Sequence, residues 1–399
     1  MRANKLLTTH ERRFPNEIFT LIIEHLHFDP SSLRNTALVC KDFAILSQQQ
    51  MFRTVDLTPA KYDTPCSYFT TFLVAPFARL LRDPKTAALT RFVRTVRLEV
   101  FDSSEMDDIL FIFRSLPSVP ELIYEGIPYP QYIQAIGMNM GETLEALWIA
   151  KWEVEREDWQ SFQYMLASLT VLKLLSLPRD CFEDEPLILP SSLRTLYVGG
   201  NASAVKQGLG ILYPPMLSTV FLGFQSKYDA SGNKLLRMLR PDTRVVLNVG
   251  DGRFCETFTP DMIAFTHGLR ASKLTLDGSE GPFIIIFIAH FVSHLPESVC
   301  EISIDFDAGT PSAVDLVSFR EDWTQLDGAL TKRYQLGLLK SFGVRCTSRT
   351  HRSNGQSFLA GDPIDRTILD DVQTLLPLSD AAGILKVDHA ALYFDDYYL

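Results

Sequence analysis

The stretch TLEALWIA, residues 143–150, contains the pattern that decides the fold of this chain of 399 residues. Apolar side chains stand at Leu144, Leu147 and Ile149, which gives the frame Φ-x-x-Φ-x-Φ, where Φ is apolar. Apolar residues two positions apart are typical of a short strand that buries one face. The same frame returns along the chain, so the stretch predicts one unit of a repeating structure and not an isolated strand.

The frame recurs at nearly regular intervals. Its third position returns every 24 to 26 residues between 98 and 222, then every 27 or 28 residues as far as 304, and a wider step of 40 residues leads to 344. Weaker copies keep only the last two apolar positions, at Leu247/Val249, Leu274/Leu276 and Leu385/Val387. The other full copies are Val93/Val96/Leu98, Val119/Leu122/Tyr124, Leu169/Leu172/Leu174, Leu193/Leu196/Val198, Leu217/Val220/Leu222, Val299/Ile302/Ile304 and Leu339/Phe342/Val344.

Segments with helical character fill the intervals, and we expect helices at 106–116, 158–169, 234–240 and 260–269, with a longer one at 321–341. A strand and a helix every 24 to 28 residues resembles the leucine-rich repeat, whose units stack into an α/β solenoid with a parallel sheet. That family usually places Asn or Cys three residues after the third apolar position, and only Asn201 fits. We therefore expect an irregular solenoid. An unrelated α/β domain with apolar strands is the alternative.

The first fifty residues predict a small helical unit. Asp29-Pro30 begins a second helix, because Asp accepts free N–H groups and Pro presets φ, and a third helix is expected at 43–51. So small a unit rarely stands alone, so it needs the rest of the chain or a partner. The first helix, with Pro15 in its first turn, has an apolar face made by Phe14, Ile18, Leu21, Ile22 and Leu26.

This unit resembles an F-box. The chain reads F-P-x-E-I-x-x-L-I-x-x-x-L from Phe14, D-P-S-S-L from Asp29 and A-L-V-C-K-D-F from Ala37, and MFRTVDL at 51–57 resembles the segment that often closes the motif. Phe14 stands where the family usually has Leu, and Phe43 where it usually has Trp. The resemblance implies an F-box domain at 1–57 and an irregular leucine-rich-repeat-like substrate-binding region at 58–399, an arrangement common among fungal F-box proteins.

Membership of this family would imply a role in ubiquitin conjugation. F-boxes bind a Skp-type adaptor that joins them to a cullin-based ubiquitin ligase, so the chain would be the substrate-recognition subunit and not an enzyme. A scaffold that binds the adaptor without directing degradation is one alternative, and an ordinary helical cap on a larger domain is another. By the resemblance, the adaptor-binding residues would be Phe14, Pro15, Ile18, Leu21, Ile22, Leu33, Leu38 and Val39.

The middle residue of each Φ-x-Φ strand points to the opposite face, which in a solenoid is the concave face of the sheet. These residues are Arg97, Ile123, Trp148, Lys173, Tyr197, Phe221, Asn248, Thr275 and Ser303. Large aromatic residues framed by small neighbours suit a protein-binding surface. We therefore expect a protein substrate to bind at Trp148, Tyr197, Phe221, Ile123 and Lys173. Ordinary packing under a loop or under residues 391–399 is the alternative.

Composition argues against several other classes of protein. The net charge is −10 and no basic block occurs, which disfavours nucleic-acid binding. The cysteines lie far apart without a C-x-x-C pair, and residues 1–13 carry no apolar run, so neither a disulfide framework nor a signal peptide is expected. The most apolar run, 283–291, is too short to span a bilayer and is expected to be a buried helix. We expect a cytoplasmic or nuclear protein that contacts no membrane.

Two pairs of residues could suggest chemistry. His290 and His294 have the spacing of a zinc helix, but no third ligand is evident, and an amphipathic helix explains them. Asp305 and Asp307 resemble the Asp-x-Asp of dehalogenase-like phosphatases, so a hydrolase is an alternative function, although Gly309 stands where that family expects Thr or Val. Solvated acids at the end of a strand also explain this pair. We expect no catalytic residue, metal or cofactor.

Overall fold

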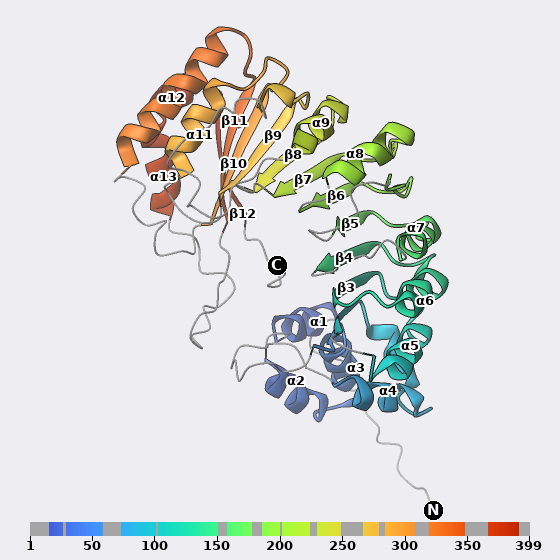
Figure 1. Ribbon diagram of the computed structural model, residues 1–399. Helices are drawn as coiled ribbons and strands as arrows, with labels where there is room; N and C mark the ends of the chain where they lie inside the picture. Colours follow the sequence, from blue (N-terminus) through green and yellow to red (C-terminus); the bar gives the residue numbers. More distant parts are fainter. Residues whose placement is uncertain are drawn as a thin grey trace, which may run out of the picture.

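The computed structural model describes residues 16–26, 29–58, 73–100, 103–150, 158–177, 186–199, 202–223, 230–248, 266–278, 284–307, 319–347 and 366–390. These residues form a mixed α/β structure on a single parallel sheet of twelve strands (Figure 1). The strand order is β1 to β12, so each strand pairs with the next one along the chain. Figure 1 shows helices α5 to α8 following one another along one side of this sheet.

The strands are short, as the frame predicts. In chain order they are β1 Thr54–Asp56, β2 Thr95–Val100, β3 Glu121–Gly126, β4 Ala146–Ala150, β5 Leu174–Leu177, β6 Thr195–Val198, β7 Thr219–Gly223, β8 Arg244–Asn248, β9 Lys273–Gly278, β10 Glu301–Asp307, β11 Ser341–Thr347 and β12 Leu385–Ala390. Residues two apart on each strand face the same side, and on one side they are almost entirely buried. The pairs Val96/Leu98, Leu122/Tyr124 and Leu147/Ile149 are examples.

The helices lie between successive strands. They are α4 Val74–Arg82, the 3-10 helix η1 Ala87–Phe92, α5 Met106–Ser115, α6 Pro130–Met140, α7 Trp159–Ser168, α8 Ala202–Ile211, α9 Ala230–Met238, α11 Ile284–Ser293, α12 Arg320–Gln335, α13 Arg366–Leu375 and α14 Pro377–Ala381. The predictions at 106–116, 158–169 and 234–240 correspond to α5, α7 and α9. The buried helix expected at 283–291 is α11, whereas most of the helix expected at 260–269 lies outside the described residues.

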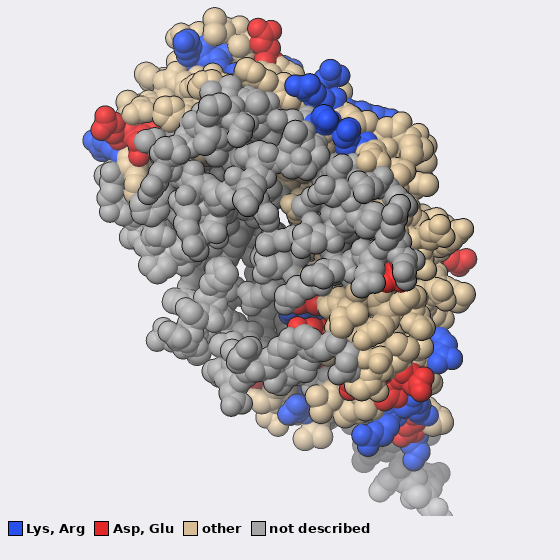
Figure 2. Space-filling model, in the orientation of Figure 1, with Lys and Arg blue, Asp and Glu red and all other residues tan. Residues whose placement is uncertain are grey.

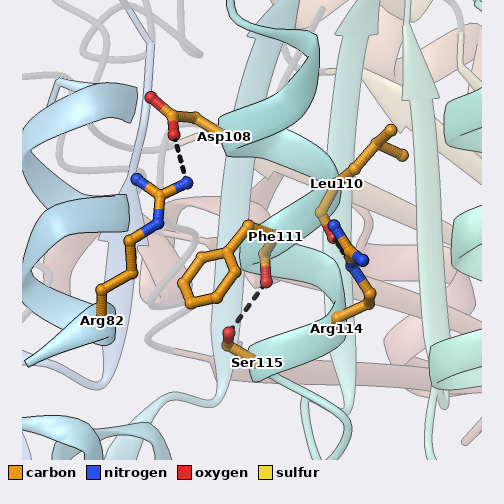
Figure 3. Close-up of polar contacts among 6 residues, drawn as sticks. All are labelled: Arg82, Asp108, Leu110, Phe111, Arg114 and Ser115. Carbon is orange, nitrogen blue, oxygen red and sulfur yellow. Dashed lines mark hydrogen bonds and ion pairs between the residues drawn. The ribbon is translucent and has the colours of Figure 1, made fainter. Parts of the chain in front are cut away.

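Helices α4 and α5 of this layer are joined by an ion pair as well as by packing. At the α4–α5 junction, Arg82 forms an ion pair of 2.6 Å with Asp108, and its guanidinium lies 4.5 Å from the ring centroid of Phe111 (Figure 3). On α5 itself, Ser115 Oγ donates to the Phe111 carbonyl at 2.8 Å. The ion pair is partly exposed, so we assign it to the alignment of the helices more than to their stability.

The N-terminal unit has the three expected helices, α1 Asn16–His25, α2 Pro30–Ala37 and α3 Lys41–Met51. The segment 51–57, expected to close this unit, supplies strand β1. Thr54 and Val55 of β1 lie opposite Thr95 and Val96 of β2 in parallel register. The helical unit therefore continues directly into strand β1 of the sheet.

The expected positions of two repeats were wrong, and the first of them is at β5. The segment LTVLKLLSL, 169–177, contains two overlapping frames, Leu169/Leu172/Leu174 and Leu172/Leu175/Leu177. The hydrogen-bond ladder selects the second, because Leu147 lies opposite Leu175 and Trp148 lies opposite Ser176. Lys173 therefore precedes the strand. Ser176 takes the place expected for Lys173 on the face of the sheet opposite the buried residues Leu147 and Leu175, which we call the inner face.

A similar shift occurs at β8, and the long helix is shorter than expected. Phe221 lies opposite Val246, so Val246 occupies the inner position expected for Asn248. Helix α12 ends at Gln335 and not at 341, because Gly337 adopts φ 71° and its N–H donates to the Tyr334 carbonyl at 2.8 Å. A glycine in this left-handed conformation is a common helix terminator.

Candidate functional site

The first helix has apolar side chains on two faces. Ile23 is buried on one face, where Phe19 meets Phe43 of α3 edge to face with 5.1 Å between ring centroids. A helix with apolar residues on both faces is normally buried on both. Here the second face is exposed, and its apolar side chains are Ile18 (41 %), Leu21 (53 %) and Ile22 (53 %).

The turn between α2 and α3 presents two more apolar side chains. Leu38 is 85 % exposed and Val39 is 67 % exposed. Their backbone N–H groups donate to the carbonyls of Asn35 and Thr36, both at 3.1 Å, so hydrogen bonds hold the turn in place. We call Ile18, Leu21, Ile22, Leu38 and Val39 the N-terminal patch. It is apolar surface that the described part of the chain leaves exposed.

Leu33 is the remaining described residue that was expected at the adaptor surface. Leu33 is only 1 % exposed, so the expectation that it offers a contact surface is not met. It is the buried residue of α2, the helix that packs on α3, and its place is in the core of the helical unit. Phe14 and Pro15 lie outside the described residues.

Asp29 caps α2, as the Asp-Pro pair predicts. Its Oδ1 accepts hydrogen bonds from the backbone N–H groups of Ser31 at 3.1 Å and Ser32 at 3.0 Å. The serine hydroxyls donate to the same carboxylate at 2.6 and 2.5 Å. These bonds, with that of the Ser31 hydroxyl contributing most, lower the pKa of Asp29 to about 2. The start of α2, and with it the position of the turn at Leu38, is thereby fixed by a charged cap.

The second candidate surface is the inner face of the sheet, where three aromatic rings form a continuous row. Trp148 lies 4.8 Å from Tyr197 between ring centroids, and Tyr197 stacks on Phe221 at 4.0 Å. Trp148 is on β4 and Tyr197 on β6, so the two rings meet across Ser176 of the intervening strand, which is buried. We call Trp148, Tyr197 and Phe221 the aromatic row. All three are partly exposed.

Charged groups border the aromatic row toward the N-terminal strands. Trp148 Nε1 donates to Glu121 Oε1 at 3.0 Å, and the other carboxylate oxygen of Glu121 accepts from Thr95 Oγ1 at 2.8 Å. Beyond it, Arg97 pairs with Glu125 at 2.9 Å. The Trp148 indole is therefore held in place by a hydrogen bond as well as by ring contacts. Glu121 was not among the predicted residues, although its position at the first inward place of the neighbouring strand could have indicated it.

Two of the residues expected to bind substrate are not available on the inner face. Lys173 directly precedes the first residue of β5, where it pairs with the exposed Glu145 at 2.7 Å, and it does not belong to the inner face. Ile123 has the expected register beside Trp148, but it is only 3 % exposed. The aromatic row is thus the part of the predicted binding surface that the structure brings together.

The residues considered for chemistry are separate from both surfaces. His294 Nδ1 lies 2.8 Å from the His290 carbonyl, an ordinary contact within a helical turn. Asp305 lies in register between Asp277 and Arg345 of the neighbouring strands. Among the residues that the structure describes, no group of three or more His, Cys, Asp or Glu side chains is placed to hold a metal ion.

Sequence comparison with protein families and with curated proteins gives no relative for this chain. No protein-family model matches it, and no curated protein matches it in sequence. Within the described part of the chain, none of the helices has both the length and the apolar character needed to cross a membrane. The function is therefore inferred from the N-terminal patch and the aromatic row.

Proposed function

We propose that this protein is the substrate-recognition subunit of a Skp-cullin-F-box ubiquitin ligase. The observation that carries the proposal is the exposure of the N-terminal patch at the positions where the sequence resembles an F-box. In this proposal α1 to α3 form the F-box, and the strands and helices that follow form an irregular leucine-rich-repeat-like solenoid. The sequential order of the parallel strands supports that second part.

The energetics favour a partner at the N-terminal patch. Burial of a large aliphatic side chain contributes about 1.5–3 kcal/mol, so a partner that covers this patch gains several kilocalories per mole. Leu38, the most exposed member, has the most to gain. An adaptor interface of ordinary size buries about 1,600 Å² in total, which is ample to cover the helices that carry the patch.

The target protein is proposed to bind on the inner face of the sheet, at the aromatic row. Partly exposed, mutually stacked rings offer contact area with little loss of side-chain freedom. A target held there is presented to a ubiquitin-carrying enzyme bound elsewhere in the ligase, and the reaction is accelerated because the effective concentration rises. This mechanism requires no catalytic residue or cofactor in the chain itself. The proposed role implies a location in the cytoplasm or the nucleus.

Co-expression with a Skp-type adaptor, followed by size-exclusion chromatography, tests the proposal. We expect a one-to-one complex that Ile18→Glu or Leu21→Glu abolishes, because a carboxylate cannot be buried in an apolar interface without a partner. Met138→Glu, at an 82 % exposed residue of α6, is the matched control and should leave the complex intact. If the chain and the adaptor elute separately, or if folded Leu21→Glu protein still binds the adaptor, the proposal fails.

Recognition of the target is tested separately. One variant combines Trp148→Ala, Tyr197→Ala and Phe221→Ala. Target proteins should no longer co-purify with its adaptor complex, while the complex itself persists. If the folded variant keeps the same set of partners, the aromatic row has only a packing role. The remaining function would then be that of a scaffold that binds the adaptor.

A further inference from the structure

A third exposed surface lies on the helical side of the sheet, at the adjoining ends of α8 and α9. The end of α8 and the turn after it expose large apolar side chains, Ile211 (63 %), Leu212 (52 %) and Met216 (51 %). Helix α9 and the turn that follows it expose basic side chains, Lys234, Arg237 and Arg240. We call these six residues the α8–α9 patch.

The apolar and basic halves of this patch are physically joined. Helices α8 and α9 pack together, and a Cβ atom at Gly210 would lie 3.3 Å from Met238 Cε, so the two helix ends touch. Tyr213, directly after the exposed Ile211 and Leu212, has its ring centroid 4.5 Å from the Arg240 guanidinium. The Tyr213 hydroxyl also contacts Thr243 Oγ1 at 2.8 Å. The guanidinium is therefore held beside the apolar residues by the Tyr213 ring.

The basic side chains of the patch are free to meet an external anion. Within the described residues, no Asp or Glu carboxylate forms an ion pair with Lys234, Arg237 or Arg240, whereas Lys173 and Lys273 elsewhere each have a carboxylate partner. The described residues between 202 and 244 hold five Lys or Arg residues and one acidic residue, Asp242. Figure 2 shows Lys and Arg gathered over α9. A local positive surface thus exists on a chain whose net charge is −10.

We propose that the α8–α9 patch binds an acidic protein segment that carries bulky apolar side chains. Carboxylates of the segment pair with Lys234, Arg237 and Arg240, and its apolar side chains cover Ile211, Leu212 and Met216. The overall negative charge of the chain repels a long polyanion, which favours a short acidic segment over nucleic acid. The proposal does not depend on adaptor binding, because α1 to α3 lie at the β1 end of the sheet, away from α8 and α9 near its middle (Figure 1).

Fluorescence anisotropy on the full chain tests this binding. The probe is a labelled synthetic peptide of about four helical turns, composed of Glu and Leu at helical spacing, at a salt concentration of about 0.15 M. One control peptide has Gln in place of every Glu, and another has Ser in place of every Leu. We expect the probe to bind at least about tenfold more tightly than either control peptide, because both halves of the patch contribute.

Variants locate the probe on the patch. Two double variants should each weaken binding of the probe about tenfold or more. One combines Lys234→Glu with Arg237→Glu, and the other combines Ile211→Ser with Leu212→Ser. The exposed Lys332→Glu on α12 and Met138→Ser on α6 are matched controls that should have no effect. The proposal is overturned if the patch variants bind the probe as tightly as the wild type does. It is also overturned if the Leu-free peptide binds the wild type as tightly as the probe does. Tighter binding of a single-stranded oligonucleotide than of the probe overturns the choice of partner.

Discussion

The ring of Tyr197 lies nearly parallel to the ring of Phe221, with 4.0 Å between their centroids and 8° between their planes. The two residues occupy the same register position on β6 and β7. Neighbouring strands are about 4.8 Å apart, so the rings lean toward each other and exclude water from the faces between them. The aromatic row is therefore a coupled unit, and its members should not contribute independently to stability.

This coupling is measurable by a double-mutant cycle in urea. Tyr197→Ala and Phe221→Ala should each lower the free energy of unfolding, and the pair should show a coupling of about 0.5–1.5 kcal/mol. Tyr164→Ala on α7, at a residue that is 77 % exposed, is the control and should change stability by less than about 0.5 kcal/mol. Strict additivity of Tyr197→Ala and Phe221→Ala would show that the rings are in contact without stabilising one another.

Asp327 of α12 should be among the polar residues most important for stability. It is 1 % exposed, its Oδ2 accepts from the Leu378 N–H at 2.8 Å, and its Oδ1 accepts from the N–H and hydroxyl of Ser379 at 2.8 and 2.6 Å. It thus caps α14 from a distant part of the chain. Asp327→Ala leaves buried donors without an acceptor and should cost about 3 kcal/mol of unfolding free energy.

Two comparisons separate the capping role of Asp327 from its charge. Asp327→Asn keeps an acceptor oxygen and should cost less than Asp327→Ala, while Asp380→Ala, an exposed acid on α14 itself, should have little effect. Hydrogen exchange at residues 377–384 locates the change. Loss of stability without faster exchange in this segment would contradict the assignment.

The repeat frame predicted much of the sheet, because alternating apolar residues mark a buried strand face wherever the strand lies. It failed at 169–177 because two frames overlap there, and only pairing with β4 decides between them. Periodicity also assigns a residue to a face without showing what covers it, which is why the burial of Ile123 was not predicted. Leu33 was assigned to the adaptor surface by the family resemblance, which does not show that this side chain is buried in the helical unit. The α8–α9 patch was not predicted, since it depends on contact between two helix ends that the chain brings together only on folding.

The charged cap of α2 makes the N-terminal unit sensitive to acid. The folded-state pKa of Asp29 is about 2, below its ordinary value of 3.8. Its stabilising contribution is therefore fully present above about pH 4 and is lost as the pH falls toward 2. NMR titration of the Asp29 carboxyl should give a midpoint near 2. A midpoint near 3.8 would contradict the capping geometry. Asp29→Asn, which still accepts hydrogen bonds, should retain the helix better than Asp29→Ala at neutral pH.

Leu33 and Leu38 should separate folding from docking, although they lie five positions apart on the same helix and turn. Leu33 is buried, so Leu33→Ala leaves a cavity and should cost about 2–5 kcal/mol of stability in urea. Leu38 is 85 % exposed, so Leu38→Ser should leave the unfolding free energy within about 0.5 kcal/mol. The same substitution should nevertheless weaken adaptor binding in titration calorimetry, because its side chain has apolar surface to bury only in the complex. If Leu38→Ser bound the adaptor as tightly as the wild type, the turn between α2 and α3 would lie outside the interface, and docking would rest on α1 alone.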